Sequence, residues 1–196
     1  MRVLIHKILA MFLLIALFPV LVVSVSLLKI ESPKLPVFFL QQRVGINGNL
    51  FTMYKLRTMR PVSREEYERL LKENETGGIL FKIKKDPRIT KVGKWLRKMS
   101  IDEFPQLINV LKGEMALVGP RPALPSEVTQ YNSNDSIRLR VLPGCTGLWQ
   151  VSGRSNVSFE EMIQLDLEYI KKQNLSFDLS ILARTFLIVL NMKGAY

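Results

Sequence analysis

The stretch ILAMFLLIALFPVLVVSVSLL, residues 8–28, contains 21 residues without a charge. As an ideal helix it would be about 31 Å long, which is enough to cross the hydrocarbon core of a bilayer. A cleaved signal peptide is a poorer interpretation, because the apolar part of such a peptide usually has only about 7–15 residues. The sequence therefore predicts a membrane-anchoring helix within residues 1–30.

Pro19, near the middle of this stretch, leaves the topology of the helix open. A proline removes one backbone hydrogen bond and presses on the carbonyl of Ile15, which bends or breaks a helix. Two arms of about 10 residues each would reach about half the bilayer depth and return. Because basic residues flank the stretch on both sides, the positive-inside bias gives no direction of crossing. The residues alone support a spanning helix and a re-entrant helix about equally.

The composition of the whole chain limits its chemistry. The 196 residues carry a net charge of +11, which favours an anionic partner such as nucleic acid, a membrane surface or a phosphorylated substrate. Cys145 and His6 are the only cysteine and the only histidine. A disulfide, a zinc site, a Cys-His pair and a Ser-His-Asp triad therefore all lack their parts. Catalysis would have to use carboxylates, hydroxyls, cations or a metal held by oxygen ligands.

A β-hairpin is expected after the apolar stretch. The segments VFFLQQRV (37–44) and LFTMYKLRTM (50–59) are rich in β-branched and aromatic residues, and GING (45–48) between them contains an Asn-Gly turn signal. Lys55 and Arg57, two residues apart, then point from the same face of the second strand. Alone, these two cations are more simply interpreted as ordinary solvated side chains.

Residues 82–98, KIKKDPRITKVGKWLRK, hold eight Lys or Arg and one Asp. Asp86 and Pro87 are typical of the Ncap and first positions of a helix. The apolar residues that follow recur at helical spacing, so the segment is expected to form a short basic amphipathic helix. Such a helix could lie on anionic lipid headgroups or pack on the core as a solvated helix.

Two further helices are marked by capping boxes, and the last segment is apolar. The boxes are Ser63 with Glu66 and, ahead of a helix over 159–172, Ser158 with Glu161. Residues 177–192, FDLSILARTFLIVLNM, are apolar enough to pack on the core or to rest at a membrane interface.

The stretch SIDEFPQL, residues 100–107, places Asp102 and Glu103 side by side. Ser100 with Glu103 has the spacing of a capping box, and Gly113 is expected to end the following helix. In that interpretation Asp102 only complements the helix dipole, a contribution of about 0.3–1 kcal/mol. However, adjacent acids at a helix N-terminus also suit a nucleophile beside a metal ligand or base. The residues alone leave both interpretations open.

Two segments that follow suit the binding of an anion. Arg121 lies between two prolines, which fix the backbone around a guanidinium that can grip phosphate with two hydrogen bonds. The segment VLPGCTGLWQVSGRSN, residues 141–156, adds Arg154 in a glycine-rich stretch that could also be a plain connector.

In four ordered segments the sequence resembles the bacterial sugar transferases, that is, the monotopic phosphoglycosyl transferases in their minimal catalytic form. The similar segments are QQRVGINGNLFTMYKLRTM (41–59), DPRITKVGKWLRKMSIDEFPQLINVLKGEMALVGPRP (86–122), PGCTGLWQVSGR (143–154) and MKGAY (192–196). They follow the family's order, and the resemblance runs from about Leu9 to Tyr196.

This resemblance implies a reaction and a set of site residues. The family transfers a sugar 1-phosphate from a UDP-sugar to undecaprenyl phosphate with release of UMP, the first membrane step of bacterial glycoconjugate or exopolysaccharide assembly. It implies Asp102 as the nucleophile that forms an aspartyl-phosphosugar intermediate, a requirement for Mg²⁺, and Glu103 in metal or proton handling, with both acids as candidate metal ligands. By the same matching, Arg97 and Arg121 should hold phosphate groups, and Lys55, Arg57, Arg154 and Asp166 should contact the substrate or shape the site.

Three positions depart from the family's pattern. Phe18 precedes Pro19 where a serine is common, so no hydroxyl is available there to bond the carbonyls that the proline frees. Ala10 lies near the place of a usual acidic residue. Cys145 replaces an aliphatic residue and is expected to be a small buried hydrophobe.

The sequence thus predicts a single α+β domain that is mainly helical with a small β-hairpin. Residues 1–30 are expected to form a re-entrant membrane helix, and residues 31–196 a catalytic domain with interfacial amphipathic helices on the cytoplasmic face of the bacterial inner membrane. The expected partners are a UDP-sugar, undecaprenyl phosphate and anionic membrane lipids, and a homodimer is left open. A membrane-anchored basic module that binds nucleic acid or lipid without catalysis would explain the net charge but not the Asp-Glu pair. Nucleic acid is not expected, because stacking aromatics are sparse near the basic run.

Overall fold

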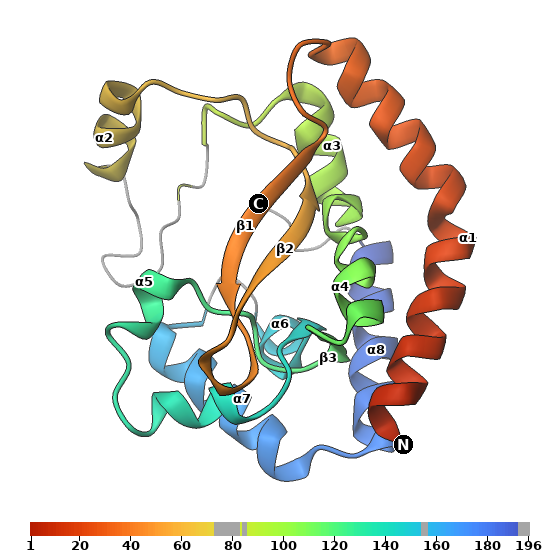
Figure 1. The fold of residues 1–196 in the computed structure, drawn as a ribbon, viewed down its shortest axis with the longest axis vertical. Coiled ribbons are helices and arrows are strands. Elements are labelled where there is room, and N and C mark those ends of the chain that lie inside the picture. The colour runs from red at the N-terminus through yellow and green to blue at the C-terminus, as the bar shows by residue number, and fades with distance from the viewer. Residues whose placement is uncertain (73–82, 84–85, 154–156, 192–196) are drawn as a thin grey trace.

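The computed structural model describes residues 1–72, 83, 86–153 and 157–191 (Figure 1). Arg154, most of residues 82–85 and the ending MKGAY lie outside these described residues. In chain order the elements are α1 (Arg2–Glu31), β1 (Phe38–Val44), η1 (Ile46–Gly48), β2 (Leu50–Leu56), α2 (Arg64–Lys72), α3 (Lys91–Lys98), η2 (Ile101–Glu103), α4 (Gln106–Lys112), β3 (Ala116–Val118), α5 (Pro125–Val128), η3 (Asp135–Arg140), β4 (Gly144–Thr146), α6 (Leu148–Ser152), α7 (Phe159–Lys172) and α8 (Leu175–Leu190). The predicted α+β class, mainly helical with a small hairpin, is confirmed.

The hairpin forms where its turn signal lies. Strands β1 and β2 pair antiparallel from Phe38 opposite Leu56 to Val44 opposite Leu50. Asn47 and Gly48 in the turn have φ values of 56° and 80°, a left-handed conformation that these two residue types adopt at low cost.

A second sheet was not predicted. The three-residue strands β3 and β4 pair in parallel, with Ala116 opposite Gly144 and Val118 opposite Thr146. A β-carbon on Gly144 would lie 2.1 Å from the backbone nitrogen of Gly119, so only glycine allows this close approach. The sheet brings the segment before Arg121 beside the segment that starts α6.

The predicted start of the basic helix is wrong. Helix α3 begins at Lys91, and the hydroxyl of Thr90 caps it by accepting a hydrogen bond from the Gly93 amide at 2.9 Å. Asp86 instead binds the guanidinium of Arg88 through both carboxylate oxygens. Because this ion pair occupies the Asp86 carboxylate, Asp86 and Pro87 remain in the loop that precedes the helix.

The capping-box interpretation of Ser100 and Glu103, one of the two left open, is also wrong. Ser100 adopts a left-handed conformation with φ of 55° and makes no capping hydrogen bond, while Glu103 binds Lys55. Helix α4 starts only at Gln106, although Gly113 ends it at φ of 84° as expected. The two acids are therefore not occupied by a structural cap.

The other two predicted helix starts are confirmed. The hydroxyl of Ser63 accepts a hydrogen bond from the Glu66 amide at 3.2 Å ahead of α2, although the Glu66 carboxylate is bound by Arg60. Ser158 and Glu161 form both hydrogen bonds of a capping box, and α7 covers 159–172 as predicted.

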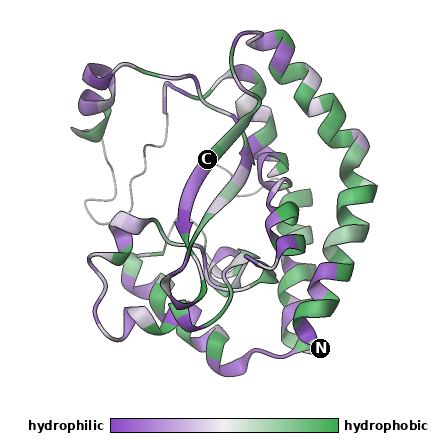
Figure 2. Cartoon of the chain, viewed as in Figure 1, coloured by the Kyte–Doolittle hydropathy of each residue, from purple (hydrophilic) through white to green (hydrophobic). Residues whose placement is uncertain are grey.

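Helix α1 runs without interruption through Pro19. Figure 1 shows it bowed along one side of the molecule, with its first turns near α8 and its last turns near α3. One of the two open alternatives, a break into two short arms at Pro19, is therefore wrong as secondary structure. By length and composition α1 could cross a membrane. Only 11% of its most apolar window is buried, whereas a core helix of a soluble protein would be mostly covered, and Figure 2 shows how hydrophobic it is.

Polar contacts attach α1 to the rest of the fold at both ends. Near its start, the imidazole of His6 lies 3.1 Å from the buried carboxylate of Asp178 on α8, which also accepts a hydrogen bond from the Tyr169 hydroxyl at 2.7 Å. At its end, the Glu31 carboxylate accepts a hydrogen bond from the Val92 amide in the first turn of α3 at 3.0 Å. Both ends of the apolar helix thus lie against the same domain.

Two of the three hydrophobic clusters among the described residues attach α1 to the other elements. The larger one joins α1, β2, α4, β3, α7 and α8, and Ala10 is fully buried in it. An acidic side chain at position 10 would therefore have to enter the apolar core. The smaller cluster consists of Leu28, Leu56, Leu96 and Ile101. Because these four residues come from α1, β2, α3 and η2, this cluster fixes the turn that carries Asp102.

Candidate active site

Five of the predicted site residues line one cavity of about 670 Å³. The two acids come from η2, and the three cations come from β2, from the residue after it and from α3. They are Asp102, Glu103, Lys55, Arg57 and Arg97. The sequence separates these residues by up to 48 positions, and the fold brings them to a single opening.

The backbone at Ser100 determines where Asp102 points. A non-glycine residue in the left-handed region costs of order 1–2 kcal/mol and persists only where its surroundings hold it. Here the turn buries Ile101, which is 2% exposed, in the smaller hydrophobic cluster. Asp102 follows it and is 8% exposed at the cavity wall. Strain in this turn is thus coupled to the placement of a carboxylate.

Glu103 is held by a cation from the hairpin. Its Oε1 lies 2.6 Å from Nζ of Lys55, and the Glu103 side chain is 44% exposed. Burial alone would raise the pKa of Glu103, but the charge of Lys55 and its hydrogen bond lower this pKa below the ordinary value. The charges of Arg121 and Arg97 act in the same direction. Glu103 is therefore ionised at neutral pH.

Asp102 titrates differently from its neighbour. Burial, and then the negative charge of Glu103, raise the pKa of Asp102 to about 6, against the opposing effect of Lys55 and Arg97. At pH 7 this carboxylate is still mainly ionised. It is also poorly solvated, which is the condition of a reactive anion rather than of a surface charge.

The raised pKa of Asp102 gives a pH-dependent stability that can be measured without metal or substrate. Because the folded-state pKa lies above the ordinary 3.8, the folded protein binds this proton more readily than the unfolded chain. The ionised group therefore costs up to about 3 kcal/mol at pH 7, and this cost decreases steadily as the pH falls from about 6 towards 3.8. In denaturant titrations at pH 7 and pH 5, wild type should gain more stability on acidification than Asp102→Asn. An equal pH response of the two proteins would contradict the raised pKa.

Further residues that line the cavity come from β4, α6 and α8. Thr146 and Thr185 line it, and their hydroxyl oxygens lie 2.8 Å apart, joining β4 to α8. Trp149 and Cys145 line it as well. Burial, followed by the charge of Glu103, raises the pKa of the Cys145 thiol well above its usual range, so little reactive thiolate forms at neutral pH. The predicted burial of Cys145 is only partial, because the residue lies at the cavity surface. Sequence reasoning missed the two threonines, because nothing local marks a hydroxyl that faces a cavity.

Arg121 and Asp166 do not line the cavity. The Arg121 guanidinium is 29% exposed and lies 3.4 Å from the carboxylate of Glu127. Asp166 is fully buried on α7 and lies 2.5 Å from the guanidinium of Arg138. Of the two roles predicted for Asp166, its position favours shaping the site and gives no support to substrate contact. Arg138 was missed by sequence reasoning, since a lone buried arginine carries no local signature.

The two neighbouring acids fit a magnesium ion only as part of a larger ligand set. Over the part of the chain that the structure describes, no three His, Cys, Asp or Glu side chains come together as a metal cluster. Magnesium is usually held by one or two carboxylates together with waters and substrate phosphates. Asp102 and Glu103 can supply these carboxylates, so the pair is compatible with Mg²⁺ if a phosphorylated substrate completes the site.

Comparison with known proteins gives a family match over nearly the whole chain. Residues 1–192 match the family model described as bacterial sugar transferase. The match includes α1, the hairpin and the segments that carry the cavity residues.

Named relatives share a large part of the sequence. The chain is 48% identical over 161 residues to the galactosyl transferase CpsE of Streptococcus agalactiae, covering 82% of this chain and 36% of that protein. It is 38% identical over 187 residues to the exopolysaccharide production protein ExoY of Sinorhizobium fredii, covering 93% of this chain and 82% of that one. Over 198 residues it is 38% identical to the UDP-glucose:undecaprenyl-phosphate glucose-1-phosphate transferase of Xanthomonas campestris, covering 97% and 39%. The chain thus spans little more than a third of two of these relatives and most of the third.

Proposed function

The chain belongs to the bacterial sugar transferase family, and we propose that it transfers a sugar 1-phosphate from a UDP-sugar to undecaprenyl phosphate and releases UMP. The observation that carries this proposal is the buried carboxylate of Asp102 beside three cations in one cavity. The name of the Xanthomonas campestris relative describes this kind of reaction, and the ExoY relative is named for exopolysaccharide production. We propose the same role in polysaccharide or glycoconjugate assembly here.

In the proposed first step, a carboxylate oxygen of Asp102 attacks the β-phosphorus of the UDP-sugar. A bond forms between this oxygen and phosphorus, and the bond from the β-phosphorus to the bridging oxygen breaks, so that UMP leaves with the electron pair. In the second step an oxygen of undecaprenyl phosphate attacks the same phosphorus, and the bond to Asp102 breaks. The carboxylate is regenerated and the sugar leaves as a polyprenyl diphosphate.

The cations of the cavity explain how the UDP-sugar and undecaprenyl phosphate, which are both anionic, can approach the Asp102 carboxylate. Lys55, Arg57 and Arg97 place positive charge around the phosphorus that Asp102 attacks, and phosphoryl transfer depends mainly on positioning and charge neutralisation. Asp102 and Glu103 would hold a Mg²⁺ ion, which when bound neutralises charge on the phosphate oxygens. Glu103, kept ionised by Lys55, then remains an oxygen ligand or a proton acceptor over the neutral pH range.

Release of UMP by the purified protein tests the proposed reaction. Wild type in detergent or nanodiscs should release UMP from a UDP-hexose in a burst no larger than the enzyme concentration, because one phosphosugar stays on each enzyme molecule. Adding undecaprenyl phosphate should convert this burst into steady turnover. A protein that releases no UMP from any member of a panel of UDP-sugars, with Mg²⁺ and lipid phosphate present, would rule out the proposed function.

We further propose that the bowed, unbroken helix α1 dips into one face of the membrane without crossing it, so that the protein is monotopic on the cytoplasmic face. The support is that both ends of α1 contact the same domain, through His6 with Asp178 and through Glu31 with Val92. Two helix ends that bind one domain are expected to lie on the same side of the bilayer.

Labelling of the two ends of α1 from either side of the membrane tests this topology. In a Cys145→Ala background, single cysteines at Lys7 and at Lys34 should both react with a membrane-impermeant maleimide only from the cytoplasmic side. Reaction of either position from the periplasmic side of intact cells would support a spanning helix instead.

A further inference from the structure

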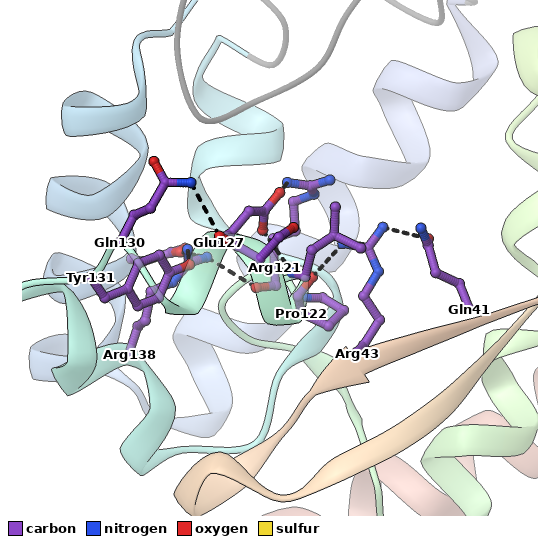
Figure 3. A network of polar contacts seen from close by, with 11 residues as sticks. Gln41, Arg43, Arg121, Pro122, Glu127, Gln130, Tyr131 and Arg138 are labelled. Carbon is purple, nitrogen blue, oxygen red and sulfur yellow. Dashed lines mark hydrogen bonds and ion pairs between the residues drawn. The ribbon is translucent and has the colours of Figure 1, made fainter. Parts of the chain in front are cut away.

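Two buried arginines bind consecutive backbone carbonyls of the loop that carries Arg121. Nη2 of Arg138 donates to the Arg121 carbonyl oxygen at 3.0 Å, and Nη1 of Arg43 donates to the Pro122 carbonyl oxygen at 3.0 Å (Figure 3). Arg138 is 3% exposed and Arg43 is 6% exposed. The loop is thus held through its backbone by guanidinium groups that solvent hardly reaches.

Each of these arginines is itself held in place. Nη2 of Arg138 also lies 2.5 Å from the carboxylate of Asp166, and its Nη1 donates to the hydroxyl of Tyr131 at 2.8 Å. Nη2 of Arg43 donates to the side-chain oxygen of Gln41 at 2.7 Å. Gln41 lies on β1, Asp166 on α7 and Tyr131 in the segment after α5, so contacts with three separate parts of the fold fix the position of the loop. Figure 3 shows Gln41 and Tyr131 beside the two arginines.

The side chain of Arg121 is bound much more weakly than its backbone. Within the part of the chain that the structure describes, its guanidinium makes one polar contact, with Glu127 at 3.4 Å, and 29% of the side chain is exposed. Glu127 also accepts a hydrogen bond from the Leu124 amide at 2.8 Å, so it is shared between the loop backbone and the guanidinium. The arrangement fixes where Arg121 starts and leaves its guanidinium able to take another anion.

The charges in this cluster do not balance. Arg43, Arg121 and Arg138 carry three positive charges, and Glu127 and Asp166 carry at most two negative ones. Burial, and then the charge of Arg121, lower the pKa of Arg43 to about 10. A buried ion pair often stabilises a fold no better than packed apolar side chains, so stability alone does not account for these arginines. The guanidinium groups of Arg43 and Arg138 do, however, fix the direction of the two loop carbonyls that they bind, and apolar packing would not do this.

We propose that Arg43 and Arg138 are positioning residues that act through Arg121, by fixing the backbone from which its guanidinium reaches a substrate phosphate. The phosphate in this statement rests on the proposed function, whereas the fixing of the loop does not. Asp166 contributes by holding the guanidinium group of Arg138 in place, which gives this buried acid a role without substrate contact.

A double-mutant cycle on activity tests whether Arg138 acts through Arg121. Arg138→Lys keeps the charge beside Asp166 but cannot serve all three of its acceptors, and it should lower kcat/KM roughly 10- to 100-fold. In an Arg121→Lys background, which lacks the guanidinium to be positioned, the same change should cost less than about 2-fold further. Arg140→Lys, on an exposed arginine two residues away, is the matched control and should leave kcat/KM unchanged. Losses that multiply in the double variant would overturn the proposal.

Hydrogen exchange tests the fixing of the loop without any substrate. Peptides that cover residues 119–128 should exchange several-fold faster in Arg138→Lys than in wild type, while peptides from α4 keep their wild-type exchange. Arg43→Lys, read in the same way, should give the same local change and serves if Arg138→Lys does not fold. Unchanged exchange in the loop of the folded variants would overturn the proposal. If wild type transfers no phosphosugar but the loop of Arg138→Lys still exchanges faster than that of wild type, the proposed function is refuted. The positioning of the loop by Arg138 is then still supported.

Discussion

Asp102→Asn is expected to lower phosphosugar transfer by several orders of magnitude while the protein stays folded. The amide has nearly the size of the carboxylate but cannot form the acyl phosphate, so the covalent route is closed. A cap at a helix N-terminus would respond differently, because asparagine caps as well as aspartate. In the structure Asp102 lies in a 3₁₀ turn at the cavity wall and not at the cap of α4.

The stability of the Asp102→Asn variant should change in the opposite direction to its activity. Because the ionised Asp102 is disfavoured by burial and by Glu103, its neutral replacement should unfold at higher denaturant at pH 7, by up to about 3 kcal/mol. Loss of activity together with a gain of stability is the signature of a strained functional group and not of a structural one. Asp135→Asn is the matched control, since Asp135 is also 8% exposed but does not line the cavity.

Mass spectrometry can identify the proposed intermediate. Wild type quenched after incubation with a UDP-sugar and no lipid acceptor should carry the mass of a phosphosugar on the peptide that contains Asp102. The Asp102→Asn protein should carry none. A well-folded Asn variant that still transfers phosphosugar at a rate comparable to wild type would exclude covalent catalysis by this residue.

Local signals predicted the elements whose causes are local. The Asn47–Gly48 turn specifies the hairpin, and Ser158 with Glu161 gives the start of α7, because in each case the interacting atoms are within a few residues. The box at Ser100 failed because Lys55, 48 residues before Glu103, binds the Glu103 carboxylate. One sequence cannot show that a distant partner competes for a capping side chain.

The same distinction holds for the candidate site. The family motifs named five residues that do share the cavity, but the sequence predicted that two prolines would fix Arg121. In the structure the fixing also depends on Arg43 and Arg138, which lie 78 positions before it and 17 after it in the chain. Strands β3 and β4, each three residues long, are too short to show a period and pair across 28 positions of sequence. Contacts of this kind follow from packing and not from local pattern.

Lys55→Met is expected to lower transfer roughly 100- to 1,000-fold at pH 7, the usual effect of removing one fixed charge from a phosphoryl or oxyanion site. Lys55 lies 2.6 Å from Glu103, and its charge lowers the pKa of both Glu103 and Asp102 against the larger opposing effect of burial. Without this charge both pKa values rise. The acid limb of the pH–rate profile should therefore move to higher pH, so that part of the lost rate returns on raising the pH.

The pH profile separates an electrostatic role of Lys55 from a purely structural one. Lys55→Arg keeps the charge, and it should keep the acid limb near its wild-type position even if the rate falls through altered geometry. Lys112→Met, which removes an exposed lysine bound to the neighbouring Tyr54 hydroxyl at 2.6 Å, should leave both the rate and the profile unchanged. If Lys55→Met lost activity with the acid limb in place, the lysine would matter only for holding β2 against η2. If the limb moves, then a cation on the hairpin sets the ionisation of the acids on η2, and the hairpin is part of the catalytic apparatus.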